Sequence, residues 1–132
     1  MKRVVLSILL FVIGFSPAWA EHFDYRVKAG KANEVYVFGR YRVLTCQADI
    51  LPQLTVRQKP KHGSVKFVKS MVRLSADTGK CAGQQIKGMK IIYTPARGYR
   101  GKDAFSVSYP YFVYESGMQR STETMSFSLD VR

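Results

Sequence analysis

The side chains that could do acid–base or nucleophilic chemistry are few in this chain of 132 residues: two histidines, two cysteines and nine carboxylates. His62 stands in the short turn Lys61-His62-Gly63, and a catalytic base there would need a nucleophile and an orienting acid beside it. No GxSxG element occurs, and the scattered carboxylates form no recognisable pair for glycoside hydrolysis. We therefore expect His62 to have a turn role in a protein that is not an enzyme and has no cofactor. A small hydrolase is the weaker alternative.

The N-terminal segment has the pattern of a secretory signal peptide. Lys2 and Arg3 precede an apolar run over 4–15, and Ala18-Trp19-Ala20 supplies the small-x-small pattern of a cleavage site. A membrane-spanning helix needs about 20 apolar residues, more than this run provides, although an uncleaved anchor is the alternative. The sequence predicts that 1–20 is a signal peptide cleaved after Ala20 and that 21–132 is a single domain, periplasmic or secreted.

Two cysteines, Cys46 and Cys81, lie in the predicted mature part. In an oxidising compartment an even pair predicts a disulfide. A metal site is disfavoured because there is no CxxC element and only His22 and His62 could join the two thiols, and a redox-active pair would need closer spacing. We expect a Cys46–Cys81 disulfide that stabilises the fold by roughly 3 to 4 kcal/mol through loop closure.

Apolar residues of the mature part alternate with period two, and no stretch has a convincing period of 3.6 residues. The alternating segments are 34–38, 41–45, 54–57, 64–67, 89–93, 105–113 and 125–131. One buried face and one exposed face are typical of antiparallel sheets. Seven or eight short strands, separated by glycine, proline and aspartate, predict an all-β, antiparallel β-sandwich.

The connection between two of these strands, 93–107, is rich in turn-forming residues. Pro95 should end the preceding strand because it cannot donate a ladder hydrogen bond. Gly98 and Gly101 permit a positive φ, and Asp103 is expected to accept hydrogen bonds from loop amides.

Two sequence elements share a recognisable pattern: PxHGxV at 60–65 and YTPxxGYxGxDxF at 93–105. In this order they resemble the signature of bacterial immunoglobulin-like, cadherin-like modules, and the resemblance covers 54–131. It implies an immunoglobulin-like sandwich of the kind found in envelope or surface proteins, often an adhesive or structural unit. The matched positions are Pro60, His62, Gly63, Tyr93, Pro95, Gly98, Tyr99, Gly101, Asp103 and Phe105.

The chain departs from this family pattern in two ways. Such modules usually stand in tandem arrays, several of which bind calcium through clustered acidic residues, whereas here a single module is expected. The acidic residues show no DxD or DxN cluster, and calcium needs six to eight oxygen ligands. We therefore expect no metal site and a turn role for Asp103.

The charge balance favours anionic partners. The 21 basic and 9 acidic side chains give a net charge of +12, which falls to about +10 without Lys2 and Arg3. Outside the cytoplasm, suitable partners are lipopolysaccharide, acidic polysaccharide, teichoic acid or a membrane surface contacted peripherally, rather than nucleic acid. The alternative is a charged surface that only keeps the protein soluble.

Two groups of residues are candidates for partner binding. Phe112 and Tyr114 are expected on the non-core face of an aromatic strand in which Pro110 favours an edge or a bulge. The basic candidates, suited to phosphate or carboxylate groups, are Lys66, Lys90, Arg97 and Arg100. The sequence thus predicts an exported binding or adhesion module for an envelope protein or an anionic glycan, with a structural periplasmic protein as the alternative. It leaves the oligomeric state open.

Overall fold

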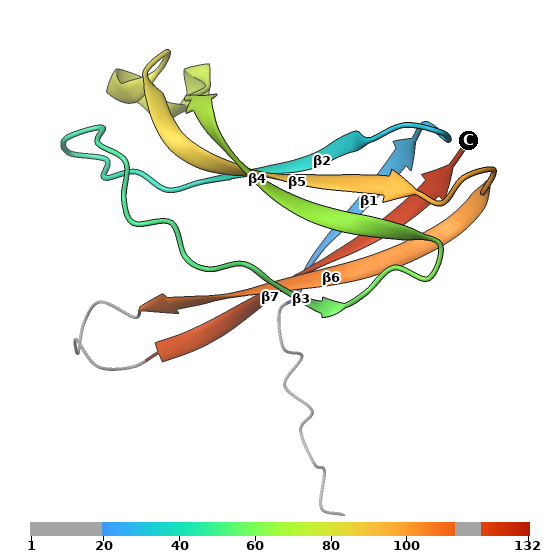
Figure 1. Cartoon of the computed structure of the whole chain (residues 1–132). Helices are drawn as coiled ribbons and strands as arrows, with labels where there is room; N and C mark the ends of the chain where they lie inside the picture. Colours follow the sequence, from blue (N-terminus) through green and yellow to red (C-terminus); the bar gives the residue numbers. More distant parts are fainter. Residues whose placement is uncertain (1–19, 113–119) are drawn as a thin grey trace, which may run out of the picture.

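Seven strands form two packed sheets in the computed structural model, which describes residues 20–112 and 120–132 (Figure 1). The first sheet has the order β1-β7-β6-β3 and the second has the order β2-β5-β4. The first consists of β1 (Glu21–Val27), β7 (Arg120–Val131), β6 (Gly101–Phe112) and β3 (Thr55–Gln58). The second consists of β2 (Asn33–Gly39), β5 (Gln85–Pro95) and β4 (Gly63–Arg73), and the 3-10 helix η1 (Ala76–Cys81) connects β4 to β5.

This strand order confirms the predicted immunoglobulin-type β-sandwich. The second, fifth and fourth strands share one sheet, and the third, sixth and seventh share the other, as in immunoglobulin-type domains. One pair departs from the antiparallel pattern, because β1 runs parallel to β7, from Glu21 opposite Met125 to Val27 opposite Val131. Residues 1–19 of the predicted signal peptide, which was expected to span 1–20, lie outside the described residues, as do Val113, Tyr114 and the expected turn at 115–117.

The core lies between the two sheets and follows the predicted alternation. Ile91 and Tyr93 of β5 are fully buried and face Phe105 of β6 and Phe127 of β7. The rings of Phe105 and Phe127 stack with centroids 4.6 Å apart. Each such side chain contributes roughly 1.5 to 3 kcal/mol through burial, so these inward faces supply most of the apolar stabilisation.

The alternation in 34–38 differs from the expectation that Val35 and Val37 share a buried face. The register between β2 and β5 shifts between Glu34 and Tyr36, which marks a β-bulge. Val35 is buried, but beyond the bulge Phe38 is the residue that enters the core, while Val37 pairs with Lys90 on the other face. One extra residue in the strand thus reverses the faces of those that follow.

The segment 41–45, expected to be a strand, forms a turn. A single bridge joins Tyr41 to Ala48, and the amide of Cys46 donates to the carbonyl oxygen of Arg42 at 2.7 Å. Val43 and Leu44 are 64% and 84% exposed. Local hydrogen bonds therefore satisfy this backbone in place of a neighbouring strand.

The predicted Cys46–Cys81 disulfide is present, with the two Cα atoms 5.3 Å apart. Both cysteines are buried and pack against Leu74 and Ile86 in a small second core. The disulfide thereby fastens the 40–54 segment to η1. Within 20–112 and 120–132, no helix is long and apolar enough to cross a membrane.

Candidate functional site

The two motif-bearing loops dock on each other at one end of the sandwich. The amide of Ala96 donates to the carbonyl oxygen of His62 at 2.7 Å, and the His62 ring stacks on the Tyr99 ring with centroids 4.1 Å apart. Gly98 and Gly101 have the positive φ values that were expected, 76° and 129°. We call residues 59–62 and 96–100 the latched loops, because they form one unit joined by backbone and ring contacts.

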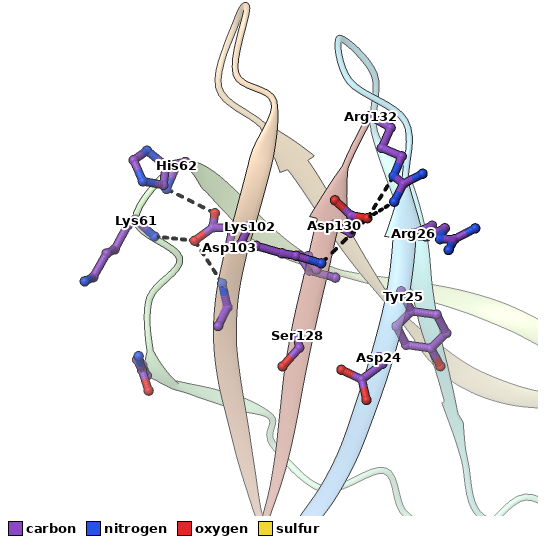
Figure 2. A pocket seen from close by; sticks show the side chains of 13 residues that line it. Asp24, Tyr25, Arg26, Lys61, His62, Lys102, Asp103, Ser128, Asp130 and Arg132 are labelled. Atoms are coloured by element: carbon purple, nitrogen blue, oxygen red, sulfur yellow. Dashed lines mark hydrogen bonds and ion pairs between the residues drawn. The ribbon is translucent and has the colours of Figure 1, made fainter.

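A buried carboxylate holds the latched loops from below. Asp103, which is 8% exposed, accepts hydrogen bonds from the amides of Lys61 (2.9 Å) and His62 (3.0 Å) and from the Tyr93 hydroxyl (2.8 Å). Figure 2 shows the carboxylate pointing toward the chain at Lys61 and His62. The predicted role of Asp103 as an acceptor for loop amides is confirmed, and these amides belong to a loop about 40 residues earlier in the chain.

The hydrogen bonds fix the protonation states of Asp103 and Tyr93, which together we call the latch. Burial would raise the pKa of Asp103, but the hydrogen bond from Tyr93 and the backbone amides of Lys61, Ala104 and His62 outweigh burial and lower it. Burial and the hydrogen bond to Asp103 raise the pKa of Tyr93. The pair therefore stays a carboxylate and a neutral phenol at neutral pH. With four donors already on its oxygens, Asp103 is suited to holding loops rather than to moving protons.

The outer surface of the latched loops is strongly cationic. Lys59, Lys61, Arg97 and Arg100 are all exposed, and Lys102 follows at the start of β6. Within the described part of the chain, only Lys102 of these five has an acidic partner, Asp130 at 3.6 Å, and its own side chain is 82% exposed. The predicted candidates Arg97 and Arg100 thus belong to a cluster of five cations on a rigid support.

An open groove of about 920 Å³ adjoins these cations on the outer face of the first sheet (Figure 2). Lys61 lies at one side of the groove and Arg26 at the other. Asp130 accepts hydrogen bonds from Arg132 through Nε and Nη2, both at 2.8 Å. The hydrogen bond from Arg132, followed by the charges of Arg132 and Lys102, lowers the pKa of Asp130. The negative charge of Asp130 is therefore compensated, whereas Asp24, an exposed carboxylate of the same groove, lies 3.4 Å from His22 Nε2.

The other predicted binding residues lie elsewhere. Lys66 is exposed on the outer face of the second sheet, as expected. On the same face, Lys90 forms an ion pair with Glu34 at 2.7 Å. Phe112 ends β6, so about 36 Å of strand separates it from the Arg100 side of the sandwich. Tyr114 lies outside the described residues. The structure therefore places Phe112 at the end of β6 that lies away from Arg100.

Five residues of the site were not singled out as binding residues, although three of them, Lys59, Lys61 and Lys102, belong to the basic series that runs from Lys59 to Lys102 in the sequence. Lys59 and Lys61 flank the first residue of the PxHGxV element, and Lys102 lies beside Asp103 in the second element. The available signal was that both elements carry cations next to their turn-forming residues. Arg26 and Arg132 had no sequence signal, because the parallel β1–β7 pairing that brings them near the groove leaves no local pattern.

No known protein-family model, curated protein or solved structure matches the chain. In the described part of the chain, no group of three or more histidine, cysteine, aspartate or glutamate side chains is arranged to hold a metal ion. The fold and the site together define an immunoglobulin-type sandwich with a cationic loop surface at one end.

Proposed function

We propose that this protein is an exported, non-catalytic binding module whose latched loops hold an anionic polymer of the cell envelope. The observation that carries the proposal is the group of four exposed cations on the latched loops, Lys59, Lys61, Arg97 and Arg100, with Lys102 beside them at the start of β6. The buried Asp103 carboxylate holds the first loop, and the second loop contacts the first through Ala96 and Tyr99.

The arrangement suits a polymer with repeated phosphate or carboxylate groups. Arginine can bind such a group through two parallel hydrogen bonds, and lysine adds point charges beside it. Cations gathered on one rigid surface repel one another, and a polyanion relieves this repulsion at several points at once. The adjoining groove offers room for further groups of the same chain between Lys61 and Arg26.

A non-catalytic role is supported by how the reactive groups are used. The Asp103 carboxylate already accepts four hydrogen bonds, and His62 is stacked on Tyr99. Both cysteines are joined in the disulfide. Asp103, His62 and the two cysteines are therefore engaged in holding the fold.

Export is supported by two features. A disulfide is typical of oxidising compartments, and the first strand begins at Glu21, directly after the expected cleavage site. Membership of the bacterial immunoglobulin-like, cadherin-like modules is part of the same proposal. It is supported by the contacts between the two loops that carry the PxHGxV and YTPxxGYxGxDxF elements. The intact mass of exported protein should correspond to a chain beginning at Glu21. A chain that retains Met1 would contradict export by cleavage.

Binding can be tested with polygalacturonate, a polyanion that has no acyl chains. The Arg97→Glu/Arg100→Glu variant should bind at least about tenfold more weakly at low salt. The loss should shrink toward 1 M salt, where the Debye length falls to about 3 Å. The matched control is Lys69→Glu/Lys87→Glu, which makes the same change in net charge at exposed positions further along β4 and β5. Its affinity should fall by no more than about threefold. Equal losses in the two variants would mean that only net charge matters and would favour the structural alternative.

A further inference from the structure

The end of the sandwich away from the latched loops leaves part of an inner sheet face uncovered. Lys69 of β4 pairs with Met89 of β5, and Met71 pairs with Lys87, so these four side chains share the face that carries Phe67 and Ile91 into the core nearby. Met71 is nevertheless 54% exposed. Beyond the end of the core, the inner face of the second sheet therefore carries two methionines and two lysines. Each methionine is paired with a lysine on the neighbouring strand.

The disulfide-bound segment forms the opposite wall. In Figure 1 the 40–54 segment runs from one sheet to the other at this end. Ile50, which is 85% exposed, lines an open cavity of about 1200 Å³ together with Leu51, Pro52 and the methionines. Large apolar side chains gathered around an exposed hollow usually mark a binding surface.

The two lysines give this apolar cavity a positive charge. Neither Lys69 nor Lys87 forms an ion pair with any described residue. The acidic residue at the cavity, Asp49, accepts a hydrogen bond from the amide of Ile50 at 2.9 Å. An inward-pointing lysine can protect an edge strand from pairing, which would account for Lys69 on β4. It does not account for Lys87, because β5 is the central strand of its sheet.

We infer that this cavity binds a single acyl chain with an anionic head group. The chain would lie against Met71, Met89 and the 50–52 segment, and the head group would contact Lys69 and Lys87. Methionine suits such a chain because its unbranched, polarisable side chain adapts to irregular apolar shapes. The charge of the two lysines selects an anion over a neutral or cationic head. The inference is independent of polymer binding by the latched loops, because the two sites share no residue.

Methionine methyl groups offer a direct readout. In protein labelled with ¹³C at the methionine methyls, dodecanoate added below its micelle concentration should shift the Met71 and Met89 signals. The Met125 signal should stay in place, because that side chain is 1% exposed in the main core. Shortening the chain from dodecanoate to octanoate should weaken binding at least about tenfold, since each buried methylene contributes to affinity.

Head-group selectivity is tested with ligands of equal chain length. Dodecyl phosphate should bind as dodecanoate does if any anionic head suffices, and a preference for one of them would identify the head group. Dodecyltrimethylammonium should bind at least about tenfold more weakly, because its charge repels the lysines. The Lys69→Glu/Lys87→Glu variant should lose about tenfold for dodecanoate, whereas Arg97→Glu/Arg100→Glu should keep its affinity. An unchanged Met125 signal in each variant verifies the fold.

Three results would overturn the inference. The first is the absence of any shift at Met71 and Met89. The second is equal binding of the anionic and cationic dodecyl ligands, which would show that the lysines take no part. The third is a shift of the two signals with protein concentration in the absence of ligand, which would show that a second copy of the chain covers this face.

Discussion

The two ends of the sandwich are held together by different chemistry, and their surfaces differ accordingly. At one end a buried carboxylate collects amide and hydroxyl donors, packs the latched loops tightly and leaves their cations pointing outward. At the other end the Cys46–Cys81 disulfide, with a hydrogen bond from Lys80 to the carbonyl oxygen of Leu44 at 2.8 Å, tethers a long segment to η1. An apolar cavity with inward-facing lysines lies beside this segment. The first end is thus held by a buried charge and its donors, and the second by a covalent bond with a small apolar core around it.

The largest expected effect lies at the disulfide. The Cys46→Ala/Cys81→Ala variant should lose about 4 kcal/mol of unfolding free energy, because the bond closes a loop of about 36 residues. Urea denaturation measures the loss. Amide hydrogen exchange should accelerate in 41–48 and in η1 and stay unchanged in the latched loops. A loss below about 1 kcal/mol would contradict the tethering role.

The second-largest loss of stability is expected at the latch. The Asp103→Asn variant should lose about 2 to 3 kcal/mol, because one carboxylate oxygen becomes an amide nitrogen that faces buried donors. Exchange at the amides of Lys61 and His62 should accelerate while the 41–48 segment remains protected. Combined with the cysteine changes, the losses should add within about 0.5 kcal/mol. Strong coupling between the two ends would contradict their independence.

Acid separates the two ends as well, since Asp103 is a buried carboxylate whose pKa is lowered by its hydrogen bonds in the folded protein. The folded-state pKa of Asp103 is lowered, so its contribution is fully present above the unfolded value of about 3.9. It is lost as the pH falls through the lower folded value. Stability measured by urea denaturation should therefore fall as the pH drops below about 4 in the native protein, and part of this fall should vanish in Asp103→Asn. An identical acid dependence in both proteins would rule out Asp103 as the cause.

The smallest effect is expected from Tyr93→Phe. The variant removes one of the four hydrogen bonds to Asp103 and leaves the backbone amides in place, so a loss of about 1 kcal/mol is expected. The thermal midpoint should fall less than in Asp103→Asn. A larger loss than that of Asp103→Asn would show that the phenol, rather than the carboxylate, organises the latch.

The sequence predicted the features that depend on local patterns. Period-two alternation gave the inward faces of β5, β6 and β7, and the two cysteines gave the disulfide. It failed where one residue changed the register, as at the bulge between Glu34 and Tyr36. It also failed at 41–45, where alternation occurs without a partner strand.

For the site, the sequence identified the residue types and only part of their grouping. Asp103 was expected to bind loop amides, but no local pattern shows that they come from Lys61 and His62. Alternation assigns a side chain to a face of a strand without saying which end of the sandwich it occupies. For this reason the sequence did not show that two of the predicted binding residues, Arg100 and Phe112, lie at opposite ends of β6.

The most direct test of the latched-loop site is the affinity of Asp103→Asn for polygalacturonate at low salt, at a temperature where the variant is folded. The substitution removes a negative charge, so attraction by net charge alone would make binding tighter. If the buried carboxylate positions the cations of the latched loops, affinity should instead fall about three- to tenfold despite the gain in positive charge. Unchanged or tighter binding would contradict the account.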